Sequence, residues 1–478
     1  MKNIEQLFIE QPEFKQKPWL IIGKGPSYQH LENLDLSAYH VLTLNHVITA
    51  QKAKISHLID LDVFENCSIE IDKNADYLIM PFYPHVNNQP SRLSLKKLIK
   101  KLPLLQKLDN ENRLYWYDHL GIKALLRHGL CPKSLHRQIR VSAFSAEAAV
   151  DILSSYGIKD ISTIGVDGGV NYHSSFDKTN TLLSNGQTSF DNQFENIIKV
   201  ITQRKVNFKE IGKNTYPIKV YIATQEEQML AVKVLEYSIN KHTSHAVEIF
   251  PLHLSNMQYR KPKDKCNQQR TPFSFQRFLI PQLNHGVGRA IYLDSDMQVF
   301  SDINLLWTLP MGSHDVLTVI PSKRDKRRLQ FSVMLMDCEK LNWHIESIID
   351  QLDSGELTYE KLMYDMGVAK NIGVCVPQEW NCLEWFNQEQ SLLVHYTDMP
   401  LQPWVSRDNK LGHLWVNDLI EAVDKGIISL DYIKEHIAQS WVRPSLLYQV
   451  EQRIPSSLNL PKNICQLDDN FIAPFKKL

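Results

Sequence analysis

The sequence has no excess of either charge and no long hydrophobic run. Its 53 lysine and arginine residues balance 53 aspartate and glutamate residues, so no overall field favours nucleic acid or an anionic membrane. No apolar stretch approaches the ~20 residues that a membrane-spanning helix needs. Near the N-terminus, Glu5 and Glu10 interrupt the segment in which a signal peptide would be apolar. We therefore expect no nucleic-acid partner, no membrane span and no signal peptide.

Cysteine motifs are missing as well. The seven cysteines are scattered between Cys67 and Cys465, without a CxxC pair or a Cys/His spacing typical of zinc. An odd, dispersed set argues against a disulfide framework and favours a reducing compartment. The chain has 478 residues, 43% of them hydrophobic, which is enough for about two to four domains. These features predict a cytoplasmic globular protein and leave its oligomeric state open.

Strands that run into glycine loops dominate residues 1–210. The apolar segment 19–22 leads into GKGPS, and a second strand, 41–44, ends at Asn45. A helix predicted over 142–156 precedes ISTIGVDGG, another strand that ends in a glycine loop. This order is typical of a doubly wound α/β sheet, whose loops line the carboxyl edge. The glycines could let backbone amides take phosphate oxygens.

Together the GxGPS loop, Asn45 and the GVDGG loop resemble the domain shared by motility accessory factors and the sialyltransferase-like fold. The resemblance covers roughly residues 15–200 and implies a nucleotide-sugar-binding fold that could have a transferase activity of its own. The alternative is that these short glycine motifs are only the tight turns of an α/β sheet.

Residues 92–108, RLSLKKLIKKLPLLQKL, form a basic amphipathic run that Pro103 interrupts. Such a segment can lie on anionic lipid, which would give the protein a peripheral contact with the inner face of a membrane. A lysine-rich face is more often the solvated surface of an ordinary helix.

A second domain is predicted from residue 217. The strand 218–223 begins it, and a later strand, 291–293, is followed at once by Asp294 and Asp296. Carboxylates at i and i+2 on extended chain point the same way. At the end of a strand they could hold one divalent cation, which could neutralise a diphosphate. Taken alone, Asp-Ser-Asp is also ordinary turn chemistry.

The flanking segments resemble glycosyltransferase family 8. The likeness consists of a strand that ends in Ala-Thr, the segment RFLIP, the YLDSD stretch, a strand at 330–337 similar to FNxGVxxxN, and residues 395–404, similar to HxxGxxKPW. It covers about residues 217–405. The resemblance implies a GT-A fold, a UDP-sugar donor, a bound Mn²⁺ with Mg²⁺ as the alternative ion, and transfer with retention. It also implies a glycan or lipid-linked oligosaccharide acceptor in bacterial surface polysaccharide synthesis.

The same resemblance assigns roles to individual residues. Asp294, Asp296 and His395 are expected to bind the metal, and two carboxylates with one imidazole suit Mn²⁺. The positions expected to contact the nucleotide sugar are Ala223, Thr224, Arg277, Asp294, Ser295 and Gln402. Arg277 could instead be a surface arginine.

Several positions depart from the family pattern. Gln402 replaces a lysine, whose charge could come from the basic loop 323–328. Gln330 and Ser332 replace an asparagine and a glycine. Near the reacting carbon, the family's glutamine falls on Tyr359, with Glu360 beside it. Glu360 and Gln330 are therefore the catalytic candidates, and a retaining reaction allows either a carboxylate nucleophile or front-face attack.

These observations predict an α/β protein of two Rossmann-like domains, the second a GT-A glycosyltransferase fold with C-terminal helices. The expected boundaries are 1–210, 217–440 and a tail at 441–478. The predicted function is a metal-dependent retaining hexosyltransferase. Two alternatives stay open: a bifunctional transferase with a second active site in residues 1–210, and a degenerate protein that only binds nucleotide sugar or glycan.

Overall fold

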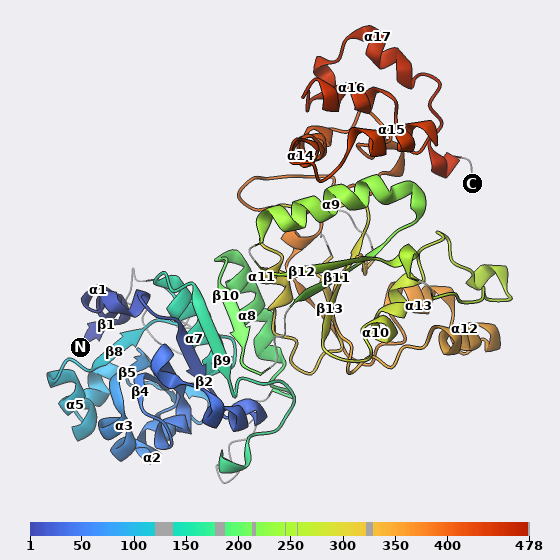
Figure 1. Cartoon of the computed structure of the whole chain (residues 1–478). Coiled ribbons are helices and arrows are strands. Elements are labelled where there is room, and N and C mark those ends of the chain that lie inside the picture. Colours follow the sequence, from blue (N-terminus) through green and yellow to red (C-terminus); the bar gives the residue numbers. More distant parts are fainter. Residues whose placement is uncertain are drawn as a thin grey trace. The chain divides into compact units, whose positions relative to one another are not determined.

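The computed structural model separates into two compact units, Met1–Asn214 with Thr308–Ser313, and Thr215–Trp307 with His314–Leu478. It describes residues 1–119, 137–176, 187–212, 217–243, 245–255, 257–321 and 328–476. Each unit contains a central β-sheet with helices around it (Figure 1). The predicted α/β class is therefore confirmed.

The first unit is built on an eight-stranded sheet in the order β1-β8-β5-β4-β3-β2-β9-β10, and every pairing in it is parallel. The strands are β1 (Lys2–Asn3), β2 (Trp19–Ile22), β3 (His40–Leu44), β4 (Ala53–His57), β5 (Ala75–Pro81), β8 (Leu114–Tyr117), β9 (Asp160–Ile164) and β10 (Asn207–Glu210). All residues of β2 and β3 are buried, as expected for a parallel sheet covered on both faces. Because β3 follows β2 on one side and β9 lies on the other, the strand order reverses at β2.

Short helices connect these strands. They are α1 (Ile4–Glu10), α2 (Leu61–Asn66), α3 (Ser68–Asn74), α4 (Leu95–Ile99), α5 (Pro103–Asn110), α7 (Ser145–Ser155) and α8 (Asn192–Gln203), and a small hairpin pairs β6 (His85–Val86) with β7 (Gln89–Pro90). Helix α7 begins at Ser145 rather than at the predicted Ser142, because the Glu147 carboxylate accepts the N–H groups of the three residues before it. It ends before Gly157, whose φ is +92°, a conformation that favours glycine.

The basic run at 92–108 forms α4 and α5. Its apolar residues pack into the hydrophobic core of the first unit: Leu95, Leu98, Ile99, Leu105 and Leu108. The lysines of the run are exposed to solvent. Because the apolar side is already buried, the structure favours the solvated-helix reading over contact with lipid.

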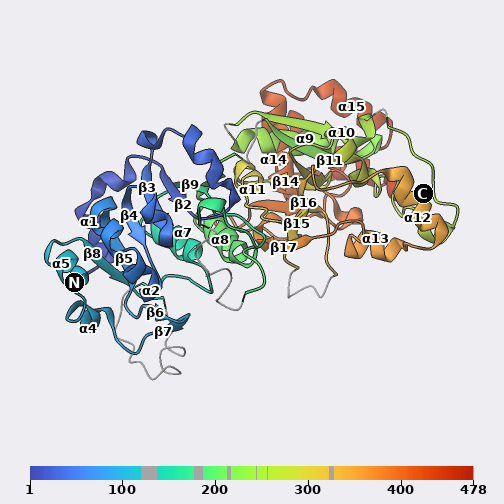
Figure 2. The same ribbon diagram turned by 90° about the horizontal axis from the view of Figure 1, so that it is seen from below.

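The second unit has a six-stranded mixed sheet in the order β12-β11-β13-β16-β15-β17. Its strands are β11 (Ile218–Ala223), β12 (Val247–Pro251), β13 (Arg289–Asp294), β15 (Val316–Val319), β16 (Val333–Asp337) and β17 (Ile372–Val376). Strand β16 runs antiparallel to both of its neighbours. A separate three-stranded sheet has the order β14-β19-β18, formed by β14 (Met297–Val299), β19 (Leu393–His395) and β18 (Cys382–Leu383). Figure 2 shows β15, β16 and β17 side by side.

The C-terminal part of the second unit is mostly helical. The helices of this unit are α9 (Met229–His242), α10 (Ile280–Leu283), α11 (Asn304–Trp307), α12 (Ile345–Ser354), α13 (Tyr359–Asp365), α14 (Gly412–Asp424), α15 (Leu430–Ala438), α16 (Ser445–Glu451) and α17 (Lys462–Cys465). Figure 1 shows α14 next to α9, and residues of both share one hydrophobic cluster with Val442, Leu446 and Val450. Residues 441–450 of the predicted tail therefore form part of the core of this unit.

Arg443 anchors that C-terminal region from inside. Its exposed fraction is 2%, and its guanidinium donates to the Pro403 carbonyl oxygen at 3.0 Å and to the side chains of Ser445 and Gln449. Burial lowers the pKa of Arg443 to about 10, with the charge of Asp468 opposing the shift. A fully buried arginine needs such acceptors, and through them Arg443 links Ser445 and Gln449 of α16 to Pro403.

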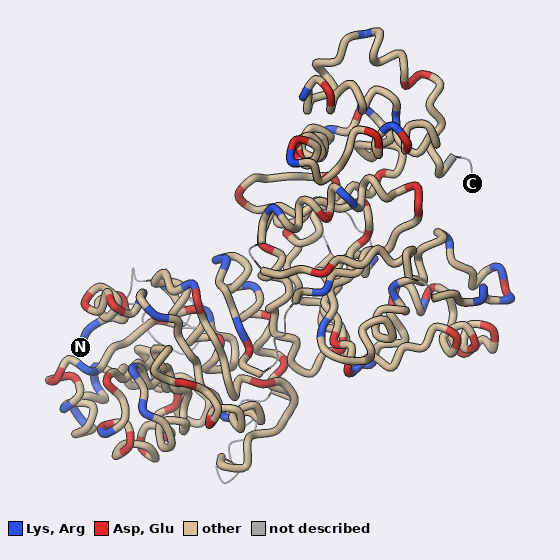
Figure 3. The backbone as a smooth tube through the Cα atoms, in the orientation of Figure 1, with Lys and Arg blue, Asp and Glu red and all other residues tan. Residues whose placement is uncertain are grey.

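Charges of both signs are interspersed along both units (Figure 3), as the balanced composition indicates. None of the helices in the described residues is long and apolar enough to cross a membrane.

Candidate metal centre

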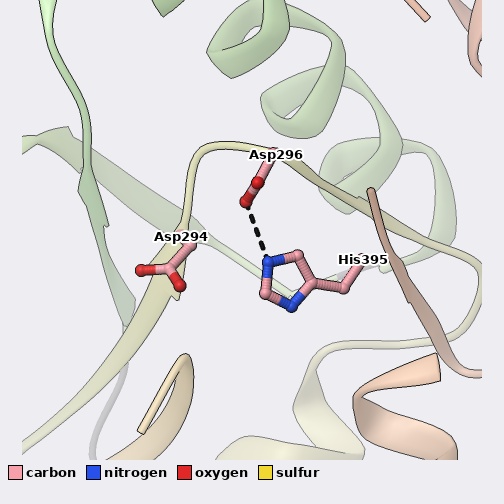
Figure 4. A group of neighbouring side chains, drawn as sticks. All are labelled: Asp294, Asp296 and His395. Atoms are coloured by element: carbon pink, nitrogen blue, oxygen red, sulfur yellow. Dashed lines mark ion pairs between the residues drawn. The ribbon is translucent and has the colours of Figure 1, made fainter. Parts of the chain in front are cut away.

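The candidate centre lies where strands of the second unit end. The pairing of β13 with β11 sets Asp294, the last residue of β13, opposite Ala223. Two residues later comes Asp296, and then β14 begins. Strand β14 pairs antiparallel with β19 so that Met297 lies opposite His395. This register brings the imidazole to the carboxylates from a point about a hundred residues further along the chain (Figure 4).

The geometry of the three side chains fits one metal ion. One ligand atom from each of Asp294, Asp296 and His395 lies within 4.8 Å of the other two. Nε2 of His395 is 3.0 Å from Oδ1 of Asp296. In the part of the chain that the structure describes, this is the only such group of three or more. Two carboxylates and one imidazole are ligands that Mn²⁺ accepts well.

A second layer of hydrogen bonds fixes the imidazole. Nδ1 of His395 lies 2.9 Å from Oδ1 of Asn381, and Nδ2 of Asn381 donates to Oγ of Ser332 at 3.2 Å. Since the amide nitrogen is used on Ser332, the amide oxygen faces the ring and Nδ1 must be the donor. Nε2 is then the nitrogen that faces the carboxylates and would bind a metal. Metal-binding histidines are commonly oriented in this way.

Asp294 has its own partners. The Tyr292 hydroxyl donates to Oδ1 of Asp294 at 2.6 Å, from two residues earlier on the same strand. Nη2 of Arg277 is 3.9 Å from that oxygen, and its guanidinium lies over the Tyr292 ring at 4.7 Å. Nη1 of Arg277 donates to the Phe331 carbonyl oxygen at 2.9 Å. Arg277 is only 8% exposed, so it is not the surface arginine that one reading predicted.

These contacts set the charges of the ligand side chains. Burial raises the pKa of Asp294, while the positive charges of Arg277 and His395 oppose the shift. For His395, burial alone would lower the pKa, but the charge and hydrogen bond of Asp296 outweigh it and the pKa is raised. Without a metal, the imidazole therefore tends to keep a proton between itself and Asp296. A bound cation would take the place of that proton.

Other predicted site residues lie around the cluster. Nε2 of Gln402 donates to Oδ2 of Asp296 at 3.0 Å and to the Tyr396 carbonyl oxygen at 3.1 Å. Ser295 is buried, and its hydroxyl donates to Oε1 of Gln228 at 2.7 Å. Both side chains are thus bonded within the protein.

The backbone at the end of β11 is held by Gln276, a residue that the sequence patterns did not indicate as part of the site. The amide of Gln276, in η9 (Gln276–Leu279), accepts from the Thr224 backbone N–H at 3.1 Å and donates to the Thr224 carbonyl oxygen at 3.0 Å. This pair of hydrogen bonds resembles the pairing between neighbouring strands and fixes the backbone of Thr224, just after Ala223. Residues 223 and 224 thus have a rigid backbone on the strand next to Asp294.

The two catalytic candidates lie differently. Glu360, in the first turn of α13, has a side chain 58% exposed and pairs with Nη2 of Arg270 at 3.3 Å. The backbone oxygen of Gln330 accepts from the Thr318 hydroxyl at 3.2 Å. No contact between described residues joins either side chain to the metal ligands. Of the basic loop, residues 322–327 lie outside the described residues, and Arg328 lies over the Tyr364 ring at 5.3 Å.

Comparison with known proteins gives the site a context. Residues 189–350 match the family model for glycosyl transferase family 8. Protein CDI of Arabidopsis thaliana is 26% identical over 231 residues, which cover 43% of this chain and 87% of that protein.

Three solved structures are similar to parts of the chain. The galactosyltransferase LgtC, in complex with donor and acceptor sugar analogues, is 12% identical, with 42% of this chain and 95% of that chain covered and a TM-score of 0.32. The glycosyltransferase GlyE of Streptococcus pneumoniae TIGR4 is 18% identical, with coverages of 48% and 65% and a TM-score of 0.31. The bifunctional glycosyltransferase WbbM is 12% identical, with coverages of 84% and 97% and a TM-score of 0.29. The assignment depends on the family match. Residues 189–350 are a glycosyltransferase family 8 domain, and the protein is a glycosyltransferase.

Proposed function

We propose that the second unit is a metal-dependent transferase of GT-A type that moves a hexose, with retention, from a UDP-sugar to an acceptor. The acceptor class is a glycan or lipid-linked oligosaccharide of bacterial surface polysaccharide synthesis. The observation that carries the proposal is the convergence of Asp294, Asp296 and His395 within 4.8 Å. The dispersed cysteines, without a CxxC pair, support the cytoplasm as the compartment.

When bound, Mn²⁺ would supply Lewis-acid stabilisation of the leaving diphosphate. The protein's part is to hold the ligands ready. Asn381 presents Nε2 of His395 to the ion, and Tyr292 with Arg277 fixes Asp294. Preorganised ligands need no rearrangement when charge develops on the leaving group.

The donor would be positioned from two strand ends. The backbone at Ala223 and Thr224, held by Gln276, lies on the strand beside Asp294 and is proposed to contact the nucleoside. Ser295 lies between Asp294 and Asp296 in the sequence. Gln402, which replaces a lysine of the family pattern, donates to Asp296 and thus steadies a metal ligand without adding a positive charge.

For the group near the reacting carbon, Glu360 and Gln330 stay the candidates because of their places in the sequence pattern. Glu360 is an exposed carboxylate with Arg270 as its partner, and solvent screens such a charge. Its contribution to stabilising the oxocarbenium-like transition state is therefore expected to be modest.

The test is turnover of a panel of UDP-sugars, by hydrolysis and by transfer, with EDTA and with added Mn²⁺. We expect at least one UDP-sugar to turn over only with the metal, and Asp294→Asn or Asp296→Asn to abolish that turnover. An exposed acid-to-amide change on α15, Asp431→Asn, is the matched control. If no UDP-sugar turns over in a metal-dependent way, the enzyme proposal for this site is wrong and a binding role replaces it.

A further inference from the structure

The first unit has a cavity of its own, about 570 Å³ in volume, at the carboxyl edge of its parallel sheet. The loops that follow β2 and β9 line it, and the strand order reverses between these two strands. Ligands of open α/β sheets bind at such a reversal point. A volume of this size is in the range of small-molecule sites.

Two glycines of the loop after β2 do not offer their amides to a ligand. The N–H of Gly23 donates to the Ile164 carbonyl oxygen at 2.8 Å, and the N–H of Gly25 donates to the Gly165 carbonyl oxygen at 2.7 Å. A Cβ on Gly23 would lie 2.2 Å from that same Gly165 oxygen. These glycines let two backbones approach each other closely, which corrects the expectation that they cradle phosphate.

The amides just before helix α7, beside the cavity, are also occupied. The carboxylate of Glu147 accepts the N–H groups of Ser142, Ala143 and Phe144 at 2.6, 3.0 and 3.2 Å. These three amides thus already hold an anionic group. An anionic ligand in this cavity needs a cationic partner from the lining.

Lys24 is that partner. Its exposed fraction is 8%, and its Nζ lies 4.2 Å from the centre of the Tyr172 ring. In the described residues the ammonium has no hydrogen bond and no ion pair. Burial lowers the pKa of Lys24 to about 8, and the charges of Cys67 and Asp60 only partly oppose the shift. An unpaired buried ammonium is costly to the folded protein, and a bound anion would relieve that cost.

The rest of the lining suits hydroxyl groups and a ring. Several residues with amide side chains line the cavity: Asn45, Asn87, Asn88, Asn171, Gln187 and Gln193. The rings of Tyr172 and Phe190 lie 5.1 Å apart on one wall. Nδ1 of His46, buried and without a partner in the described residues, is a further polar atom for a ligand. Burial, with the charge of Asp62 adding to its effect, raises the pKa of the Asp60 carboxyl group to about 6. This carboxyl group can therefore accept a hydrogen bond from a ligand hydroxyl or, when protonated, donate one.

We infer that this cavity binds a hydroxyl-rich phosphate ester, a sugar phosphate or a nucleotide, whose phosphate pairs with Lys24. This site is separate from the one at Asp294, and it does not rest on the proposed transferase function. Because Lys24 supplies a positive charge at this site, we expect the ester to bind without added metal.

The test is calorimetric titration of the full chain in EDTA, which silences the metal centre. The probes are UMP, AMP and glucose 1-phosphate, with inorganic phosphate and glucose as controls. We expect at least one ester to bind, and Lys24→Met to weaken it by about 10- to 100-fold, the usual loss of a buried charged hydrogen bond. UMP or AMP as the tightest probe identifies a nucleotide, and glucose 1-phosphate a sugar phosphate. Lys96→Met, an exposed lysine of α4, should leave the affinity unchanged.

A second measurement separates a ligand-binding lysine from a structural one. Lys24→Met keeps the stem and removes the unpaired charge, so its melting temperature without ligand should equal or exceed that of the parent protein. Metal-dependent UDP-sugar turnover should be unchanged in this variant. The inference fails if no ester binds in EDTA, if Lys24→Met binds as tightly as the parent, if inorganic phosphate binds as tightly as the esters, or if the variant melts at a lower temperature.

Discussion

Replacement of Asn381 by alanine should weaken metal binding although Asn381 is not itself a metal ligand. Asn381 holds Nδ1 of His395 through its amide oxygen at 2.9 Å and is itself held by Ser332 at 3.2 Å. The alanine variant leaves the buried Nδ1–H without an acceptor. The ring can then rotate or change tautomer, and Nε2 no longer faces Asp294 and Asp296 reliably.

The size of the effect follows from the burial of this pair. His395 is 5% exposed and Asn381 is 6% exposed, so water replaces the lost acceptor poorly. An unsatisfied buried donor costs about 1–3 kcal/mol, and about 1.4 kcal/mol corresponds to a factor of ten in affinity. We therefore expect the Kd for Mn²⁺ to rise by roughly 10- to 100-fold, the range found for outer-shell partners of metal sites.

The assay is titration of Mn²⁺ into metal-free protein, followed by electron paramagnetic resonance of the free ion at a temperature well below unfolding. Ser332→Ala, which frees the Asn381 amide to turn, should show a smaller loss in the same direction. Asn417→Ala, on the exposed face of α14, removes a hydrogen bond to Glu421 only and should not change the Kd. Equal Mn²⁺ affinities for the Asn381→Ala variant and the parent would refute the orienting role of this amide.

Two further changes test the protein elsewhere. Glu360→Gln should lower kcat of the metal-dependent reaction by less than about tenfold, because the exposed carboxylate is screened and paired with Arg270. A steady-state assay with the best UDP-sugar measures this. A loss of a thousandfold or more would make Glu360 a catalytic residue. Arg443→Ala should lower the free energy of unfolding by about 3 kcal/mol or more, because several buried acceptors lose their donor at once. Urea unfolding measures that loss, and a change below about 1 kcal/mol would show that the region after residue 440 is loosely attached.

The sequence was most informative over short local stretches. The alternation of side chains on extended chain predicts that Asp294 and Asp296 lie together, and Tyr292 could have been added by the same rule. In the structure β13 ends at Asp294, and Asp296 lies in the bend before β14. His395 could not be found by local pattern, because only the pairing of β14 with β19 brings it there. The resemblance to a family placed it in the right order along the chain.

The outer layer of the centre was beyond the reach of sequence patterns. Asn381 meets Ser332 across 49 positions, and Gln276 meets Thr224 across 52. Amide side chains are common, and no spacing rule says which of them faces which backbone or ring. The sequence also did not reveal that Arg277 is buried. Its position on a short helix is compatible with a surface residue, and only the structure shows its guanidinium packed over the Tyr292 ring.

Unit boundaries show the same limit. Thr308–Ser313 is grouped with the first unit although its neighbours in sequence belong to the second. The grouping reflects contacts such as the one in which the Ser313 N–H donates to the Asp191 carboxylate at 2.7 Å, 122 positions away. Composition changes along the sequence can indicate domain boundaries, but they do not reveal a short segment that packs with another unit.

The two sheet edges illustrate how charge selects a ligand. After β13 the chain places two carboxylates and an imidazole together, so a diphosphate proposed to bind at this edge would need a metal cation to offset the two carboxylates. After β2 it places one buried ammonium with amides and rings, so that edge supplies its own positive charge. Removal of divalent metal should therefore separate the two sites, abolishing nucleotide-sugar chemistry in the second unit while leaving phosphate-ester binding in the first. A single effect of EDTA on both would mean that the ammonium of Lys24 is not the charge that the ligand meets.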